Sequence, residues 1–147
     1  MQKLITFLII FFNFGYLFSN EEYFLTLRNE KVNLRQGPSF DYPVKIFYKK
    51  KYLPVLIQDS SNNFRKIRDH ENNSGWIHIS QLSKKKAAIV IEDELIMFGN
   101  PTVYSNPIAL LKKGRLVKIR KCNDKWCKAI SEDFKGWVKK NSLWGLL

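Results

Sequence analysis

The chain contains an internal repeat, in which a set of residue patterns recurs 61 to 63 positions later. The matching segments are Pro38-Ser39 with Pro101-Thr102, Lys50-Lys51 with Lys112-Lys113, Phe64-x-Lys66-Ile67 with Trp126-x-Lys128-Ala129, and Gly75-Trp76-Ile77 with Gly136-Trp137-Val138. The matches keep their order and drift by only two positions, which chance rarely produces. The repeat therefore predicts two homologous modules of about 55 to 60 residues, near the lower size at which a domain folds alone.

The residue pattern within each half is that of short β-strands. Runs rich in β-branched and aromatic residues lie between turn-forming clusters, and no sustained 3.6-residue apolar period follows residue 20. The expected strands are 44–48, 52–58, 64–68 and 75–78 in the first half, and 108–111, 116–122, 126–130 and 136–139 in the second. A further apolar run at 87–96 either opens the second module or pairs with the first. About five short strands in so few residues cover their edges by closing, so we expect an all-β chain of two small tandem barrels.

The first 19 residues have the pattern of a secretory signal peptide. A short cationic start, Met1-Gln2-Lys3, precedes an apolar run of 15 residues from Leu4 to Phe18. That run is shorter than the roughly 20 residues needed to span a bilayer as a helix, and an uncleaved membrane anchor is the alternative. We expect cleavage near Ser19, a periplasmic or secreted protein, and division of the chain into 1–19, 20–85 and 86–147.

Composition narrows the class of protein and leaves its partner open. Hydrophobic residues make up 45% of the chain, which suffices for a packed core and excludes a disordered protein. The 25 Lys and Arg against 13 Asp and Glu give a formal charge of +12, which favours anionic partners. Because 19 of the basic residues are Lys and only six are Arg, a biased genomic composition explains the same charge.

Two sequence patterns carry a resemblance to a known family. One is Val32-Asn33-Leu34-Arg35-x-Gly37-Pro38-Ser39, and the other is Gly-Trp-Ile or Gly-Trp-Val with a leucine six residues after each Trp. Together they resemble the bacterial SH3-like (SH3b) domain, and the chain resembles small exported proteobacterial proteins with two tandem SH3-like repeats. The resemblance implies five-stranded barrels that bind a cell-wall peptide or a protein and hold no catalytic residues. The second copy departs from the pattern, because Phe98 stands where the first has Arg35.

Ligands of SH3-like folds meet aromatic and basic loop residues, so we place the candidate binding site in the loop after the first strand. The candidates are Arg35, Phe40, Asp41 and Tyr42. Trp76 and Trp137 are expected in the two cores, because burial of aromatic side chains drives the folding of small domains, and the alternative is that they line a groove. Trp144 either covers the second barrel or forms half of an exposed aromatic groove.

Cys122 and Cys127 bracket a four-residue turn between two expected strands. In an exported protein, cysteines that face each other across a hairpin can oxidise, so we expect a structural disulfide. Metal binding is the weaker alternative, because two cysteines without His or acidic partners at ligand spacing cannot complete a tetrahedral zinc site. A redox role would favour two intervening residues rather than four. We expect no metal and no cofactor.

Catalysis is not expected from the distribution of reactive residues. A cysteine peptidase of the cell-wall type needs a nucleophilic Cys and a His that follows it, but His70 and His78 precede both cysteines. The sequence contains no Gly-x-Ser-x-Gly, His-Glu-x-x-His or phosphate-binding glycine loop.

The sequence thus predicts an exported, non-catalytic binding module for a cell-envelope peptide, peptidoglycan or an envelope protein. The alternative is electrostatic association with an anionic membrane or lipopolysaccharide through the lysine runs 49–51, 84–86 and 139–140. For each run the competing interpretation is a solvated edge that resists aggregation. Nucleic acid is not an expected partner, because export would separate the protein from it.

Overall fold

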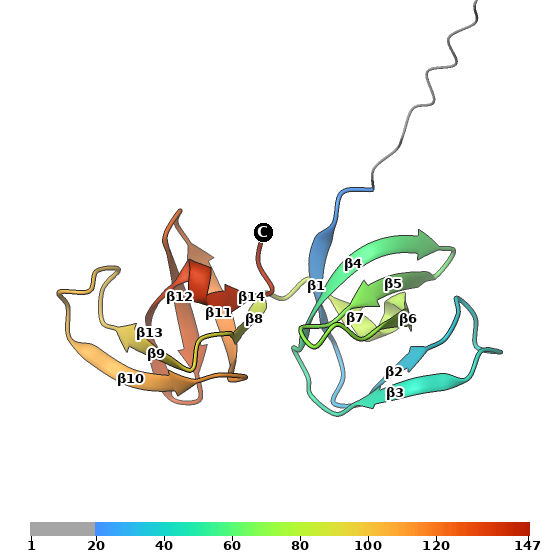
Figure 1. The fold of residues 1–147 in the computed structure, drawn as a ribbon, viewed down its shortest axis with the longest axis horizontal. Helices are drawn as coiled ribbons and strands as arrows, with labels where there is room; N and C mark the ends of the chain where they lie inside the picture. The colour runs from blue at the N-terminus through green and yellow to red at the C-terminus, as the bar shows by residue number, and fades with distance from the viewer. Residues whose placement is uncertain (1–19) are drawn as a thin grey trace, which may run out of the picture.

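The computed structural model describes residues 20–147, and the predicted signal peptide at 1–19 lies outside the described residues. The strands of the described chain form two seven-stranded sheets, each curled around its own core (Figure 1). We call the part built from β1–β7 the first module and the part built from β8–β14 the second module. Within residues 20–147, no helix has the length and apolar character needed to cross a membrane. The expected all-β architecture of two tandem SH3-like units is confirmed.

The first module consists of short antiparallel strands. They are β1 (Tyr23–Leu27), β2 (Val32–Arg35), β3 (Val44–Tyr48), β4 (Pro54–Ser61), β5 (Phe64–Arg68), β6 (Ser74–His78) and β7 (Leu82–Ser83), with the 3₁₀ turn η1 (Ile79–Gln81) before β7. Their order in the sheet is β3-β2-β6-β5-β4-β1-β7. Strand β1 was not expected from the sequence, and it lies between β4 and β7.

The second module repeats this arrangement. Its strands are β8 (Ala87–Val90), β9 (Glu94–Phe98), β10 (Pro107–Lys112), β11 (Leu116–Cys122), β12 (Trp126–Ser131), β13 (Phe134–Lys139) and β14 (Leu143–Trp144), with η2 (Lys140–Ser142) before β14. The order β10-β9-β13-β12-β11-β8-β14 is that of the first module with each number raised by seven. The apolar run at 87–96 is therefore two strands, and it opens the second module, because β8 pairs with β11 and β14.

The sequence repeat corresponds to a repeat of three-dimensional contacts. A Cβ added to Gly75 would lie 2.6 Å from the carbonyl oxygen of Arg35, and a Cβ added to Gly136 would lie 2.6 Å from that of Phe98. In both modules, a glycine in the strand before the 3₁₀ turn lets a neighbouring strand approach more closely than any side chain allows.

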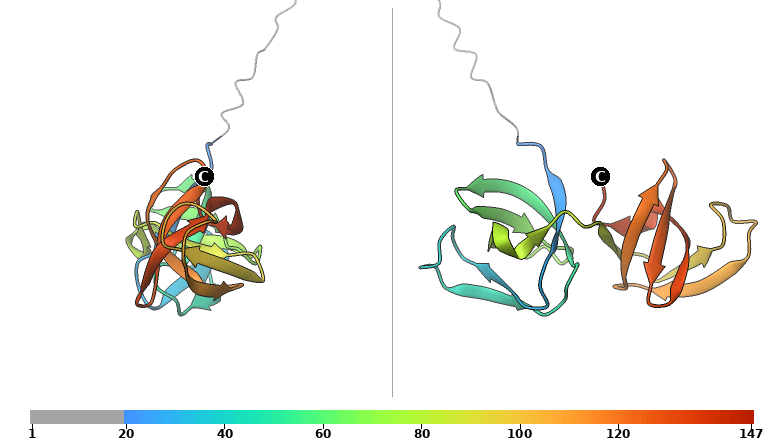
Figure 2. Two further views of the ribbon diagram at one scale, coloured as in Figure 1. Left: turned by 90° about the vertical axis from the view of Figure 1, so that its left-hand side faces the viewer. Right: turned by 180° about the vertical axis from the view of Figure 1, so that it is seen from behind.

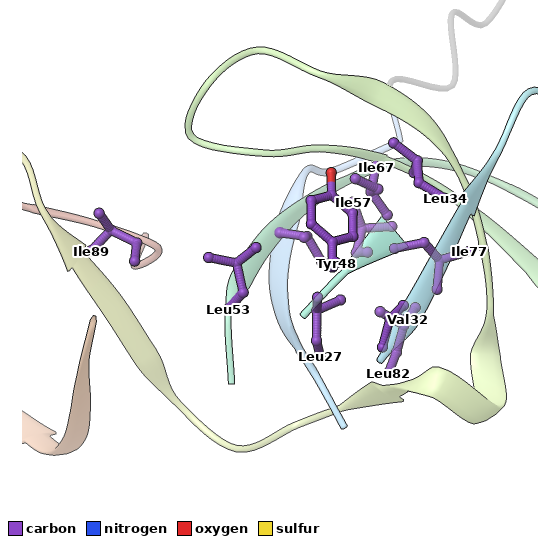
Figure 3. Close-up of a cluster of buried hydrophobic side chains, with 11 residues drawn as sticks. Leu27, Val32, Leu34, Tyr48, Leu53, Ile57, Ile67, Ile77, Leu82 and Ile89 are labelled. Atoms are coloured by element: carbon purple, nitrogen blue, oxygen red, sulfur yellow. The ribbon is translucent and has the colours of Figure 1, made fainter. Parts of the chain in front are cut away.

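The expectation that Trp76 and Trp137 lie in the cores is wrong. Side chains alternate between the two faces of a strand, so Trp76 cannot share a face with its neighbour Ile77. Ile77 and Val138 are fully buried, whereas both Trp side chains are half-buried on the opposite face. The core of the first module instead holds Leu27, Val32, Leu34, Tyr48, Leu53, Val55, Ile57, Ile67, Ile77 and Leu82 (Figure 3).

The two modules contact each other at the segment that joins them. Ile89 of β8 is only 1% exposed, and it belongs to the core cluster of the first module, on the side where Leu53 lies (Figure 3). Trp144 of β14 packs edge-on against Phe24 of β1, with the ring centroids 4.9 Å apart. Trp144 is therefore part of the junction between the modules, which neither sequence interpretation anticipated.

The C-terminal segment lies in the same junction (Figure 2). Gly145 has a φ of +123°, and a Cβ added there would lie 2.8 Å from the Cβ of Pro54 and 2.9 Å from the carbonyl oxygen of Ala87. Only glycine combines that backbone conformation with such close approach. The chain therefore passes between the two modules at a point where no side chain fits.

Candidate binding site on the first module

The loop between β2 and β3 is held in place by Arg35. Its Nη1 donates hydrogen bonds to the carbonyl oxygens of Tyr42 at 2.8 Å and Phe40 at 3.2 Å. The loop is closed at its base by the Gln36 amide, which donates to the carbonyl oxygen of Pro43 at 3.1 Å. Arg35 was predicted as a ligand contact, and the structure shows that its guanidinium already organises the loop.

Phe40 is exposed at the tip of this loop but is not isolated. Its ring centroid lies 5.2 Å from that of Phe64 and 5.1 Å from that of His78, and the Arg35 guanidinium lies over its face at 5.4 Å. Aromatic and cation–π contacts of this kind each contribute about 1 kcal/mol. We call Phe40, Phe64 and His78 the aromatic cluster.

The strand register brings the aromatic cluster together. Phe64 of β5 is the direct cross-strand partner of His78 of β6, and their rings make an edge-to-face contact at 5.1 Å. His78 Nδ1 accepts a hydrogen bond from the Ser80 amide at 3.2 Å, so the neutral ring carries its proton on Nε2. The cluster therefore combines two apolar rings with one nitrogen donor.

The remaining predicted residues lie in the same loop. The Tyr42 ring occupies the space beside Gly37, where a Cβ would lie 2.5 Å from the ring carbons. The amide of Asp41 donates to Ser39 Oγ at 3.0 Å, which holds the exposed Asp41 in a local turn. Phe64 and His78 were missed by the sequence analysis, because they lie on other strands. The structure buries Gly75 and Ile77, and the alternation along β6 therefore places His78 on the outer face.

The second module has a different arrangement at the equivalent place. Phe98, at the position of Arg35, makes an edge-to-face contact with Trp126, at the position of Phe64, with ring centroids 5.8 Å apart. The loop that follows β9 is closed at its base in the same way, by the Gly99 amide, which donates to the carbonyl oxygen of Asn106 at 2.9 Å. Inside this loop Ser105 takes the place of the arginine, because its amide donates to the carbonyl oxygen of Thr102 and its Oγ accepts from the amide of Asn100. The arginine-backed loop therefore belongs to the first module alone.

The cysteines form the predicted disulfide between Cys122 and Cys127, which are cross-strand partners in β11 and β12. The bond leaves no free thiol in the chain. Among residues 20–147, no group of three or more His, Cys, Asp or Glu is arranged to hold a metal ion.

Three solved structures resemble the chain weakly. NlpC2 from Trichomonas vaginalis is 15% identical with a TM-score of 0.39, over 84% of this chain and 48% of that chain. NlpC1 from the same organism is 13% identical with a TM-score of 0.38, over 84% of this chain and 45% of that chain. An NlpC/P60 family protein from Bacillus cereus is 10% identical with a TM-score of 0.37, over 82% of this chain and 55% of that chain. The chain spans about half the length of each of these structures.

No curated protein sequence matches the chain. The profile of the bacterial SH3 domain, however, matches it twice, at residues 28–84 and 92–145. The first match covers β2–β7 and the second covers β9–β14, so each seven-stranded sheet contains one copy. The chain therefore belongs to the bacterial SH3 domain family and carries two copies of the domain in tandem.

Proposed function

We propose that the protein is an exported, non-catalytic binding protein of the cell envelope, and that the aromatic cluster of its first module contacts the ligand. The ligand is a cell-wall peptide, peptidoglycan or an envelope protein. Membership of the bacterial SH3 family supports a binding role, because these domains are typically binding modules for cell-wall components.

The observation that carries the proposal is that the Phe40 ring is exposed to solvent and yet held in place by its neighbours. Its side chain is 63% exposed, yet the ring is supported by Phe64, His78 and the Arg35 guanidinium. An exposed apolar ring held in one position loses little conformational entropy when a partner covers it. Aromatic anchors of this kind dominate the energetics of protein recognition.

Phe47 provides a matched control for Phe40. It lies on β3 of the same module, is 55% exposed, and has the Lys31 ammonium over its ring at 5.3 Å. We expect Phe40→Ala to reduce retention on insoluble peptidoglycan, or crosslinking to an envelope protein, about tenfold. Phe47→Ala is expected to retain wild-type binding. Equal behaviour of the two variants would show that the aromatic cluster is not the contact surface.

Export is part of the proposal, and it rests on the residue pattern of positions 1–19. We expect the mature protein to be recovered from periplasmic or secreted fractions with its N-terminus near Asn20. Fractionation of cells followed by N-terminal sequencing measures both. Recovery of the intact chain from the cytoplasm would contradict the proposal.

The electrostatic alternative is attachment to an anionic membrane or lipopolysaccharide through the three lysine runs. Flotation with anionic liposomes at low salt and at about 0.5 M salt separates it from the proposal, because charge-driven binding is screened at high salt. The alternative would be favoured if Phe40→Ala floated with liposomes at low salt as the wild type does and was also retained on peptidoglycan as the wild type is.

A further inference from the structure

Two adjoining hollows, which extend from the junction between the modules over β11 and β12, are lined mostly by basic residues. They have volumes of about 350 and 340 Å³ and share Arg120 and Ile130 in their walls. Their basic residues, which we call the basic groove, are Lys85, Lys86, Lys118, Arg120, Lys121, Lys128 and Lys135. No carboxylate lines either hollow, and none of the ion pairs formed within residues 20–147 involves these seven residues.

One pair in the groove works against the stability of the sheet. Lys121 of β11 is the direct cross-strand partner of Lys128 of β12. Like charges placed directly opposite each other destabilise an antiparallel pair. At the equivalent position of the first module, Asp59 of β4 faces Lys66 of β5, which is a favourable pair.

The two modules share the backbone geometry that displays these residues. Both strands have a register irregularity at this point, between Ile57 and Asp59 in the first module and between Ile119 and Lys121 in the second. A β-bulge redirects the side chains beside it, and Arg120 and Lys121 are both exposed. The backbone is therefore common to both modules, whereas the charge is specific to the second. A general excess of lysine does not explain this difference.

The groove ends at Tyr52, in the junction between the modules. Tyr52 has a φ of +65°, a conformation that bulky residues rarely adopt. Its counterpart in the repeat is Gly114, with a φ of +83°. A tyrosine thus occupies a position where glycine is the unstrained choice.

Ammonium groups from three separate segments of the chain lie close to the Tyr52 ring. The Nζ atoms of Lys118, Lys51 and Lys85 lie 4.9, 5.3 and 5.6 Å from its centroid. Lys51 and Lys85, followed by Lys118, lower the pKa of its phenol. The ring therefore marks a point of high positive potential, where the linker meets β11.

We propose that the basic groove binds the chain of an anionic polysaccharide, which lies along β11 and β12 and reaches the Tyr52 end. Six of the seven cations are lysines, which act as point charges and lack the planar fork with which arginine recognises a single anion. They suit a polymer with repeated charges. This site is separate from the aromatic cluster and does not depend on the function proposed for the first module.

Two other polyanions fit the groove less well. Single-stranded nucleic acid needs free aromatic faces for its bases, but ammonium groups already lie over the rings of Tyr52 and Trp137, the latter covered by Lys121 at 5.7 Å. A membrane surface needs cations on a flat or convex face, whereas these cations line hollows.

The test uses the full chain on immobilised heparin, a sulfated polysaccharide, eluted with a NaCl gradient. Lys121→Asp gives the second module the charge pair of the first. We expect this variant to elute at lower salt and its dissociation constant to rise about tenfold. Its thermal midpoint should be equal to or higher than that of the wild type, because a like-charge pair becomes an opposite pair. Arg120→Gln places at position 120 the residue type found at the equivalent position of the first module, Gln58. This variant should also elute at lower salt than the wild type.

Lys49→Asp is the control, because it changes the net charge equally at an exposed residue outside the groove. It should elute close to the wild type. Equal elution of Lys121→Asp and Lys49→Asp would overturn the proposal, since binding would then follow net charge alone. Stronger binding of the wild type to a (dT)₂₀ oligonucleotide or to anionic vesicles than to heparin would also overturn it, in favour of those partners.

Discussion

The Tyr48 hydroxyl donates a hydrogen bond of 2.8 Å to Oδ2 of Asp69, and both residues are buried in the first module. Asp69 also accepts from the amides of Glu71 and Asn73 and from Asn73 Nδ2. The carboxylate therefore closes the turn between β5 and β6 and anchors it to β3. The second module has no such arrangement, because Ser131 stands at the position of Asp69.

Tyr48→Phe should destabilise the protein by about 2 kcal/mol at pH 7, because a buried carboxylate loses a hydrogen-bond donor. Burial, followed by the bond to Asp69, raises the pKa of Tyr48 above its ordinary value of 10.0. The unfolded chain releases this proton near pH 10 while the folded protein retains it, so this contribution is complete below pH 10 and is lost as the pH rises further. Urea unfolding between pH 7 and 11 should show a smaller alkaline loss for Tyr48→Phe than for the wild type. Parallel losses would contradict the assignment.

Gly136→Ala should lower the unfolding free energy by about 2 kcal/mol, because the new Cβ would overlap the carbonyl oxygen of Phe98 and the side chain of Met97. Gly99→Ala is the matched control. Its Cβ would lie 3.7 Å from its nearest neighbour, the carbonyl oxygen of Asn106, so a change below about 0.5 kcal/mol is expected. Chemical denaturation of both variants measures the difference, and similar losses would exclude close strand approach as the cause.

Ile89→Ala should cost about 3 kcal/mol, as expected for truncation of a fully buried isoleucine. Its effect should appear in the first module, although Ile89 belongs to the second. Amide hydrogen exchange should therefore show reduced protection in β4. Ile91→Ala, at a side chain that is 43% exposed, should leave exchange unchanged. Loss of protection confined to the second module would show that Ile89 does not support the first core.

Reduction of the Cys122–Cys127 bond should destabilise the second module by about 2 kcal/mol, the value expected for so short a loop. Urea unfolding with and without dithiothreitol measures this loss. Cys122→Ser should unfold like the reduced wild type and should not respond to the reductant. An unchanged midpoint on reduction would mean that the hairpin between β11 and β12 is stable without its crosslink.

Much of the fold is predictable because its signals are local. The strands 44–48, 64–68 and 116–122 begin and end at the expected residues, since β-branched and aromatic runs there lie between clear turn residues. Strand β1 was missed because Tyr23–Leu27 follows soon after the apolar run at 4–18, and its pairing partners in β4 and β7 are distant in sequence. Local patterns do not contain that information.

The candidate sites depend more strongly on tertiary structure. Arg35 and Phe40 lie close in sequence, so a motif finds both, whereas Phe64 and His78 come from other strands and meet Phe40 only through register. The cross-strand pairing of Lys121 with Lys128 also depends on tertiary structure, because it follows the register irregularity in β11. The role of Arg35 as a donor to its own loop requires the loop conformation itself.

Gly145 and Ile89 both contribute to the junction between the two domains, because the chain at Gly145 passes close to Pro54 and Ala87, and the Ile89 side chain of the second module packs in the core of the first. These contacts restrict the relative motion of the aromatic cluster and the basic groove. A ligand long enough to reach both would meet the second site at a high effective concentration, and its avidity would exceed either single affinity. Ligands shorter than that span would bind with the affinity of one site alone, so the junction selects partners by their length.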